Sequence, residues 1–415
     1  MSKCSKRNIY RCWIPPFNTP RPAIRPTTFT GPVSWGANAS GQLGNGDNSI
    51  ARVPTAVAES AALAGDKIVQ MAGGEDHALG LGVSGRVYAW GDNTNGQLGN
   101  GSFGGEINVP EGPVQGAITG KRIVQVRAGR RYSLVLAEDG LAYSWGLNDM
   151  GQLGDGTFID KAMPVAILGL ASLTEVAAGR THGLARQNTA LFAWGSGSDG
   201  ELGNGTNIMY TPTAVAVDQT GVLAGKTISR VSAGDRYSVV LDPIIGKAYT
   251  WGRNNRGQLG DLSNTERNVP VAVYDAGALA GRRLADLDAG YDHVVSHDID
   301  DIFSWGAGTR GQLGNGLLMD SNQPVVGVKT AEMADKRILE VTAGRDFSAA
   351  VLDSGEVFAW GDDTLGQLGD DGAAAPFTPV PVAVDYDADL DIVALSNIDA
   401  GADAMYAIAE VAPPS

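Results

Sequence analysis

The sequence repeats one short motif at regular intervals. The dipeptide Trp-Gly occurs seven times, and neighbouring copies are 49 to 57 residues apart. Gly-Gln-Leu-Gly follows six of the copies at a fixed offset, and Gly-Glu-Leu-Gly follows the remaining one. Self-similarity with a period near 50 residues is typical of β-propellers and solenoids, which stack equal structural units. The seven tryptophans are Trp35, Trp90, Trp145, Trp194, Trp251, Trp305 and Trp360.

A second motif accompanies the first. It has the form Ala-Gly-x-x followed by His or an aromatic residue, and it lies 15 to 17 residues before a Trp-Gly copy. Each repeat also contains four short strand-like segments, such as IVQVRAG, YSLVLAEDG, LAYSWG and MPVAI. Four short antiparallel strands per unit is the content of a propeller blade. The rings that end the second motif are His77, Tyr132, His182, Tyr237, His293 and Phe347.

Each end of the chain carries one half of a repeat, and the two halves are complementary. Trp35 has no Ala-Gly copy before it, and the last copy, AGADA at 400–404, has no Trp-Gly after it. Strands from about 391–411 and about 33–57 would therefore share one blade and close the ring, which removes open sheet edges. The sequence predicts an all-β, seven-bladed β-propeller of four-stranded antiparallel blades. We expect one propeller domain at 31–415, preceded by a basic, Pro-rich extended arm at 1–30.

The repeated stretch that follows each tryptophan is interpreted as scaffold. A Trp at the end of a strand can pack its large apolar surface between neighbouring blades. The glycines allow positive φ in a tight turn, the Gln side chain can bond the loop backbone, and the Leu fills the space between blades. Because seven blades pose the same packing problem, the motif recurs without marking a site.

Together the two motifs resemble the regulator of chromosome condensation repeat family. The resemblance covers residues 31 to 411 and rests on Trp-Gly-x-Asn-x-x-Gly-Gln-Leu-Gly with Ala-Gly-x-x-His. It implies a seven-bladed propeller but no single function, since members include a Ran GTPase exchange factor, a plant UV-B photoreceptor and domains attached to ubiquitin ligases. The photoreceptor resemblance would imply Trp after the Gly of several Ala-Gly motifs. We expect no light sensing, because the residues at those positions are Glu75, Arg130, Arg180, Asp235, Tyr291, Arg345 and Ala402.

The exchange-factor function, as the resemblance implies it, uses a wedge that protrudes from one repeat and displaces nucleotide from the GTPase. This chain has no long insertion. Its only candidate wedge is its longest irregular stretch, GSFGGEINVPEGPVQG at 101–116. A guanine-nucleotide exchange factor for a Ran-like small GTPase therefore stays open as an alternative function.

Motifs that could support catalysis or ligand binding are all copies of the repeat. His77, His182 and His293 occupy a position that also accepts Phe347, which indicates a structural ring and not a base or metal ligand. GVLAGKT at 221–227 has three residues between its glycines where a phosphate loop needs four. The Asp- and Asn-rich turns lack the spacing of a calcium loop and suit tight turns. We predict a non-enzyme with no catalytic residue, cofactor or metal.

Function should reside where the repeats differ, on loops held by the rigid ring. The two residues after each Ala-Gly vary, and they should crowd onto one face near the axis. Glu75, Asp76 and Asp403 would form an acidic arc, and the next three repeats a basic arc, so that a two-signed face could orient a partner. An ordinary solvated rim would share this composition. The candidate partner-binding residues are Glu75, Asp76, Arg130, Arg131, Arg180, Asp235, Arg236, Tyr291, Asp292, Arg345, Asp346 and Asp403.

The arm is a second candidate for partner binding. Residues 1–30 contain six basic residues, no acidic residue and both cysteines of the chain. Their prolines favour an extended backbone, and apolar anchors on such a backbone are typical of a peptide that docks in the groove of another protein. A disordered leader would have the same composition. The arm anchors we expect are Tyr10, Trp13, Ile14 and Phe17.

The charge distribution limits the partners. The chain carries a formal charge of −15, and because residues 1–30 contribute +6, the remainder carries −21. An acidic body opposes nucleic-acid binding by the propeller, and no apolar run is long enough to span a membrane. No secretory signal is recognised, which favours an intracellular or assembly-associated protein. We expect a non-catalytic propeller that binds a protein partner of unknown identity; the alternatives are a small GTPase as partner and a structural subunit anchored to an assembly by the arm.

Overall fold

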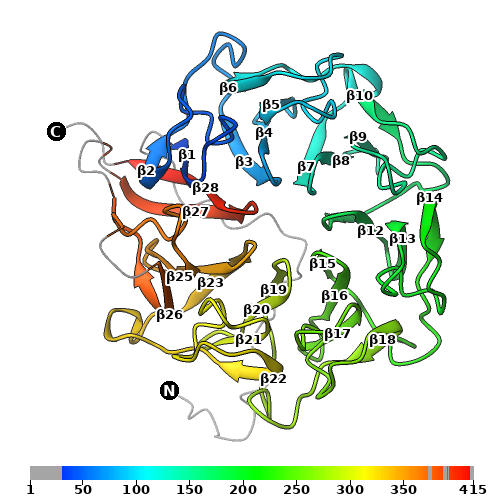
Figure 1. The fold of residues 1–415 in the computed structure, drawn as a ribbon, viewed down its shortest axis with the longest axis vertical. Helices are drawn as coiled ribbons and strands as arrows, with labels where there is room; N and C mark the ends of the chain where they lie inside the picture. Colours follow the sequence, from blue (N-terminus) through cyan, green and yellow to red (C-terminus); the bar gives the residue numbers. More distant parts are fainter. Residues whose placement is uncertain (1–29, 373–375, 387–389, 391, 412–415) are drawn as a thin grey trace, which may run out of the picture.

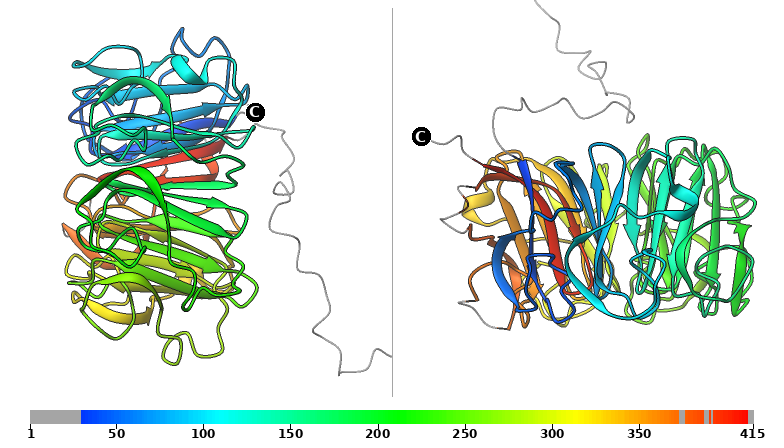
Figure 2. Two further views of the ribbon diagram at one scale, coloured as in Figure 1. Left: turned by 90° about the vertical axis from the view of Figure 1, so that its right-hand side faces the viewer. Right: turned by 90° about the horizontal axis from the view of Figure 1, so that it is seen from above.

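The chain folds into a ring of seven four-stranded antiparallel sheets around a central axis (Figure 1). The computed structural model describes residues 30–372, 376–386, 390 and 392–411. Seen from the side, the ring is a flattened disc (Figure 2). The prediction of an all-β, seven-bladed propeller is therefore confirmed.

Six blades each contain four consecutive strands, which run outward from the axis in chain order. The first and second blades contain β3 (Ile68–Gly73), β4 (His77–Gly82), β5 (Val87–Asp92), β6 (Glu106–Glu111), β7 (Ile123–Ala128), β8 (Tyr132–Ala137), β9 (Ala142–Gly146) and β10 (Lys161–Ala166). The third and fourth contain β11 (Glu175–Ala178), β12 (His182–Gln187), β13 (Ala190–Ser196), β14 (Tyr210–Ala216), β15 (Arg230–Ala233), β16 (Tyr237–Asp242), β17 (Lys247–Gly252) and β18 (Arg267–Ala272). The fifth and sixth contain β19 (Asp286–Ala289), β20 (His293–His297), β21 (Ile302–Gly306), β22 (Ser321–Val326), β23 (Ile338–Ala343), β24 (Phe347–Leu352), β25 (Val357–Asp362) and β26 (Phe377–Ala383).

The seventh blade, which we call the closing blade, joins the two ends of the chain. From the axis outward it consists of β27 (Ile392–Ala400), β28 (Ala404–Val411), β1 (Thr30–Gly36) and β2 (Ala51–Ala56). β1 pairs antiparallel with β28 over its whole length, with Trp35 opposite Met405. Figure 1 shows these first and last strands side by side, in blue and red. The predicted closure of the ring is confirmed.

The position of a strand in its blade explains its sequence. The second and third strands are covered on both faces by neighbouring blades, so β8 (YSLVLA) is buried at every residue. The outer strands face solvent on one side, and β10 has a buried residue only at Pro164. The core is accordingly a series of apolar clusters between blades, and one of them packs β1 and β28 against the sixth blade.

The seven repeated tryptophans connect each blade to the one before it. All seven side chains are fully buried, and each indole Nε1 donates to the carbonyl of the Gln or Glu in the preceding copy of the loop motif, over 2.8–3.1 Å. Gly44 has a φ of +70°, and a Cβ there would overlap the Trp90 ring. Gln42 Oε1 accepts from Ser40 N at 2.9 Å. These contacts agree with the interpretation of the motif as scaffold.

The segment expected to be the longest irregular stretch is mostly regular. Glu106–Glu111 of the candidate wedge forms β6, the outer strand of the first blade, and Gly116–Ile118 forms the short 3-10 helix η2. The expectation was wrong because Pro110 is tolerated in an outer strand, whose one edge needs no partner. A second 3-10 helix, η3, spans Ala331–Met333. No helix in the described part of the chain is long and apolar enough to cross a membrane.

Candidate partner-binding face

The turns after the Ala-Gly motifs meet around the axis on one side of the disc, which we call the Ala-Gly face. The first variable residue of each turn donates its backbone N–H to a carbonyl of the turn in the next blade. Seven such hydrogen bonds of 2.8–3.2 Å run round the axis, and the last, from Ala402 N to Gly74 O, returns to the first blade. The backbone of this face is therefore fixed by a closed ring of hydrogen bonds between blades.

The glycine of the motif allows this close approach. A Cβ at Gly129 would overlap the Tyr132 ring and the carbonyl oxygen of Gly179 in the next blade. The same residue types recur in the other blades, so the scaffold glycines bring the variable residues of different blades together.

Glu75 lies between four arginine side chains on this face. Its carboxylate lies 2.8 Å from Arg130 Nε, 3.4 Å from Arg345 Nη2, 3.6 Å from Arg180 Nη2 and 3.8 Å from Arg131 Nε. These arginines come from the second, third and sixth blades. Only 12 % of the Glu75 side chain is exposed, whereas the arginines are about one-third exposed, at 27–37 %. One acidic residue therefore holds four guanidinium groups around the axis.

Tyr291 completes this arrangement from the fifth blade. Its ring centre lies 5.5 Å from the guanidinium of Arg180 and 5.2 Å from that of Arg345. Burial raises the pKa of the Tyr291 hydroxyl to about 12, so the ring stays neutral. A space of only about 70 Å³ remains among these side chains and the Ala-Gly backbone. We call Glu75, Arg130, Arg180, Tyr291 and Arg345 the axial cluster.

The second variable residues of several turns contact the loop motif of the preceding blade. Gln258 Nε2 donates to Asp292 Oδ1, and Gln312 Nε2 donates to Asp346 Oδ1, each over 2.9 Å. Arg236 Nη1 lies 3.2 Å from Asp199 Oδ2. The scaffold Gln of the loop motif therefore also positions acidic residues of the Ala-Gly face.

Several carboxyls on this face have raised pKa values. Burial raises the pKa of Asp403 to about 6, although Arg345 Nη1 is 2.9 Å away and opposes the shift. Burial also raises the pKa values of Asp76, Asp292 and Asp346 above the ordinary range. Burial therefore makes the charged form of these carboxyls less favourable than it would be in water.

The acidic and basic residues of the Ala-Gly face do not form two separate arcs, as the sequence analysis expected, but contact one another. Glu75 contacts the basic residues directly, because long Arg side chains reach across the narrow axis. Asp235 lies 3.5 Å from Arg180 and 3.2 Å from Arg253, a residue that the sequence analysis missed. The face is one interlinked network with arginines at its surface. The arm anchors Tyr10, Trp13, Ile14 and Phe17 lie outside the described residues.

Exposed apolar side chains also lie in loops on this side of the disc. Gly91 pairs with His77 at the end of β5, beside the Ala-Gly turn, so the loop that follows lies on the same face. The corresponding loops expose large apolar side chains, with Phe103 58 % and Ile159 64 % accessible. Such residues among Gly, Asn and Asp were the sequence signal that could have identified this surface. The apolar rim consists of Phe103, Phe158, Ile159, Ile208, Met209, Leu317, Leu318 and Met319.

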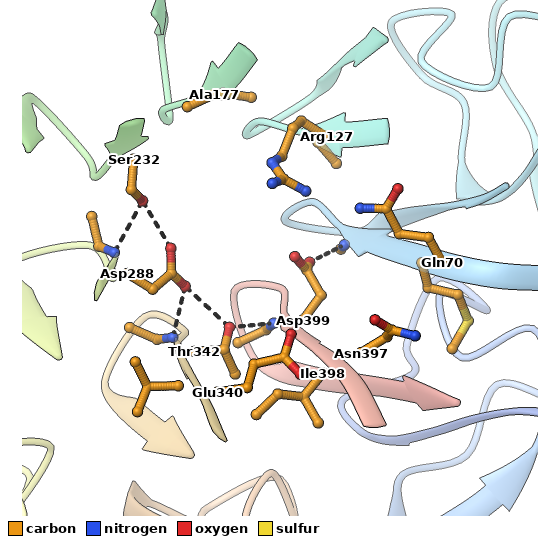
Figure 3. Close-up of a pocket in the computed structure, with 18 of the residues that line it drawn as sticks. Gln70, Arg127, Ala177, Ser232, Asp288, Glu340, Thr342, Asn397, Ile398 and Asp399 are labelled. Atoms are coloured by element: carbon orange, nitrogen blue, oxygen red, sulfur yellow. Dashed lines mark hydrogen bonds between the residues drawn. The ribbon is translucent and has the colours of Figure 1, made fainter. Parts of the chain in front are cut away.

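Behind the axial cluster, the axis contains a polar cavity of about 450 Å³ (Figure 3). Asp288 accepts hydrogen bonds from Ser232 Oγ at 2.8 Å and from Thr342 Oγ1 at 3.1 Å. Asp399 Oδ2 accepts from Gly73 N at 2.9 Å and so links the closing blade to the first blade. Both carboxylates therefore accept hydrogen bonds from neighbouring blades.

The histidines of the second motif are structural, as the sequence predicts. His182 is fully buried, and its Nε2 lies 3.0 Å from Ser238 Oγ of the next blade. Burial lowers the pKa values of His77 and His182 to about 4 and that of His293 to about 3. Phe347 is fully buried at the same repeat position. Among the residues that the structure describes, no group of three or more His, Cys, Asp or Glu side chains could hold a metal ion.

Comparison with known proteins identifies the family. The regulator of chromosome condensation (RCC1) repeat matches residues 34–81, 84–136, 139–186, 190–241, 246–296 and 300–351. The chain belongs to the RCC1 repeat family. The six matches contain the first six Trp-Gly copies, from Trp35 to Trp305, and the first match begins in β1 of the closing blade.

RCC1-repeat relatives differ in length and in what they do. The ultraviolet-B receptor UVR8 of Arabidopsis thaliana is 33 % identical over 342 residues, which cover 81 % of this chain and 74 % of the receptor. The human E3 ubiquitin-protein ligase HERC2 is 31 % identical over 340 residues, 81 % of this chain, but the match spans only 7 % of HERC2.

Solved structures share the fold of this RCC1-repeat chain. Human WBSCR16 superposes with a TM-score of 0.79 at 22 % identity, covering 92 % of this chain and 99 % of WBSCR16. Prp20p of Saccharomyces cerevisiae superposes with a TM-score of 0.78 at 20 % identity, covering 93 % of each chain. At these identities the likeness establishes the propeller architecture alone.

Proposed function

We propose that this RCC1-repeat chain is a non-catalytic propeller that binds a protein partner through the Ala-Gly face. The observation that carries the proposal is the axial cluster, in which one carboxylate holds arginines from three blades on a backbone fixed by seven hydrogen bonds between blades. Arginine and tyrosine at the centre of a rigid surface, with apolar side chains around them, is a typical composition of a protein interface. The apolar rim supplies those side chains.

The partner surface should present acidic residues near the second to fourth blades. Arg131 has only a 3.8 Å contact to the Glu75 carboxylate, and Arg236 is 39 % exposed. Both guanidinium groups can bond an additional carboxylate without breaking a short ion pair. Complementary charge of this kind sets orientation and association rate more than affinity, while the apolar rim would supply most of the buried area.

One protein of the same fold supports interaction with proteins. Prp20p is described as having binding properties to Gsp1p and histones. Exchange-factor activity is a less favoured alternative here, because β6 occupies the middle of the expected wedge. It predicts faster nucleotide release from a Ran-like GTPase and loss of that acceleration when 101–116 is shortened.

The proposal is tested by cross-linked affinity capture with matched charge reversals. The test variant changes Arg130, Arg131, Arg180 and Arg236 to Glu. The control variant changes Arg86, Arg122, Arg283 and Arg337 to Glu, on the opposite side of the disc. A partner captured by the native chain and the control, but lost with the test variant while its propeller is still folded at the capture temperature, supports the Ala-Gly face. Equal capture by both variants would refute it.

The structural-subunit alternative depends on the arm, which lies outside the described residues. It predicts that deleting residues 1–30 abolishes incorporation into an assembly while the propeller still folds. Including this deletion as a further bait separates the two ideas, because only the arm deletion should remove an assembly partner.

A further inference from the structure

The inner strand of every blade directs one backbone N–H group at the axis. In the second blade, Gly129 N donates to Tyr132 O of the neighbouring strand β8 at 2.9 Å. Because bonded and non-bonded pairs alternate in an antiparallel sheet, the N–H of Ala128 points away from β8 and towards the axis. The equivalent bond occurs in all seven blades. The residues with such axial N–H groups are Gly73, Ala128, Ala178, Ala233, Ala289, Ala343 and Ala400.

Four of the axial N–H groups have an acceptor in the preceding blade. The acceptor is the side chain directly before the Ala-Gly motif of that blade, as in the bond of 3.1 Å from Ala289 N to Ser232 Oγ. The other three bonds, of 2.9–3.0 Å, join Ala343 N to Asp288 Oδ2, Ala400 N to Thr342 Oγ1 and Gly73 N to Asp399 Oδ2. The wall of the axis is therefore satisfied from the fourth blade round to the first.

The remaining three axial N–H groups have no acceptor among the described residues, because the side chains at the corresponding places of the preceding blades contain no acceptor atom. Buried N–H groups without a partner are rare, and they indicate a bound ion or water as the acceptor. The three groups are Ala128 N, Ala178 N and Ala233 N, and the side chains that precede them are Ala72, Arg127 and Ala177.

Arg127 adds a charged donor to the same part of the axis. Its guanidinium is directed into the axial cavity (Figure 3). Nη1 donates to the carbonyl of Val126 at 3.2 Å, and within the described part of the chain the guanidinium forms no ion pair. A guanidinium without a carboxylate partner has the geometry to bind one. We call Arg127 and the axial N–H groups of Ala128, Ala178 and Ala233 the donor wall.

The rest of the cavity limits the charge of a ligand. Asp288, Glu340 and Asp399 line the side opposite the donor wall, so a singly charged anion suits the site better than a doubly charged one. The volume of about 450 Å³ is within the range of small-molecule sites. Val69 and Val124 line the cavity at the start of the inner strands, where they are 39 % and 46 % exposed. The cavity therefore opens on the side of the disc away from the Ala-Gly face.

We propose that the donor wall binds the carboxylate group of a small organic acid. The carboxylate accepts hydrogen bonds from the axial N–H groups and from the Arg127 guanidinium, which together form an anion-binding concavity. A free amino acid would in addition direct its ammonium group towards Asp399. Because the entrance lies on the other side of the disc, the inference does not depend on partner binding by the Ala-Gly face.

The NMR shifts of Ala128, Ala178 and Ala233, measured in the full chain with isotope-labelled alanine, test the proposal. The probes are acetate, glycine and inorganic phosphate, and sodium chloride controls for ionic strength. Acetate and glycine should shift the three amides with a saturating dependence on concentration, whereas chloride should not. Arg127→Gln should weaken acetate binding about tenfold or more, since a charge-assisted hydrogen bond is lost. Arg86→Gln, at an exposed position, is the matched control and should bind acetate like the native chain.

A second variant supplies an acceptor from within the chain. In Ala177→Ser the new hydroxyl takes the place that Ser232 has in the next blade, so Ala233 N gains an acceptor. We expect weaker acetate binding together with an unchanged or higher unfolding temperature, because the variant adds a hydrogen bond without removing one.

Saturating shifts that weaken in Arg127→Gln and Ala177→Ser, but not in Arg86→Gln, support the site. Tighter binding of glycine than of acetate identifies an amino acid as the ligand class, and equal binding identifies a simple organic acid; both support the proposal. Carboxylate shifts no larger than those with chloride would overturn it, since the donors then bond only water. Tighter binding of phosphate than of acetate would overturn the assignment to carboxylates. If Arg127→Gln unfolds, Ala177→Ser still gives the decision.

Discussion

Glu75 and Arg345 are 270 residues apart and belong to the first and sixth blades, yet Arg345 Nη2 lies 3.4 Å from Glu75 Oε1. The contact is possible because each residue directly follows the glycine of an Ala-Gly motif, and the turns at these motifs meet at the axis. The same carboxylate also receives Arg130 and Arg180. The repeated scaffold therefore brings together residues that differ from one repeat to the next.

Removal of the central carboxylate should destabilise the ring. In a Glu75→Gln variant, four guanidinium groups lose their shared counter-charge, and we expect a loss of about 2 kcal/mol in the free energy of unfolding, a value that allows for the partial exposure of the arginines. Urea unfolding measures it. The matched control is Glu138→Gln, since Glu138 is 69 % exposed and 3.9 Å from Arg122. A loss no larger than that of the control would contradict the central role of Glu75.

The pH dependence of stability should contain a contribution from Asp399. Burial raises its pKa to about 7 in the folded chain, against an ordinary value of 3.8. The folded state therefore retains this proton longer than the unfolded state, and the stabilising contribution is complete below pH 4 and lost as the pH rises to about 7. Asp399→Asn keeps an acceptor for Gly73 N and removes the titration.

The measurement for Asp399 is the difference between two unfolding curves. The free energy of unfolding of Asp399→Asn minus that of the native chain should increase from pH 4 to pH 7 and then level off. Carboxyls that are distant from Asp399 titrate equally in both proteins and cancel in this difference. A difference that is constant with pH would show that the carboxyl is ionised normally.

The buried histidines should destabilise the chain in acid. Burial lowers the pKa values of His77 and His182 to about 4, below the ordinary 6.5, so the unfolded state binds protons first as the pH falls through 6.5. Phe347 shows that the position accepts a phenyl ring. We expect a His77→Phe, His182→Phe, His293→Phe variant to lose less stability between pH 7 and pH 4 than the native chain. Thermal unfolding at a series of pH values provides the check, and parallel curves would disprove it.

The tryptophans allow packing to be separated from hydrogen bonding at the closing interface. Trp35→Phe should cost about 1 kcal/mol through loss of the bond from Nε1 to Gln367 O, and Trp35→Ala about 3–5 kcal/mol through the cavity that it leaves. Trp194 forms the equivalent 2.9 Å bond to Gln152 O within the continuous chain and serves as the matched position. Chemical denaturation of the four variants gives the values; equal costs for Phe and Ala would contradict this division.

Most of the fold could be predicted from local sequence patterns. The spacing of Trp-Gly and Ala-Gly fixes the number of blades, and the unmatched Trp35 and AGADA at 400–404 predict how the ring closes. These patterns are informative because each blade must satisfy the same packing and hydrogen-bonding demands with nearby residues. The structural roles of His77 and the loop Gln follow from the same repetition.

The tertiary structure alone decided which variable residues meet. The sequence identified the turn residues but not that Glu75 would contact arginines of three blades, because those contacts depend on the radius of the ring and on side-chain reach. The apolar rim was missed for a related reason. The exposure of a side chain depends on how neighbouring blades pack, whereas a repeat motif shows only the contacts that recur in every blade.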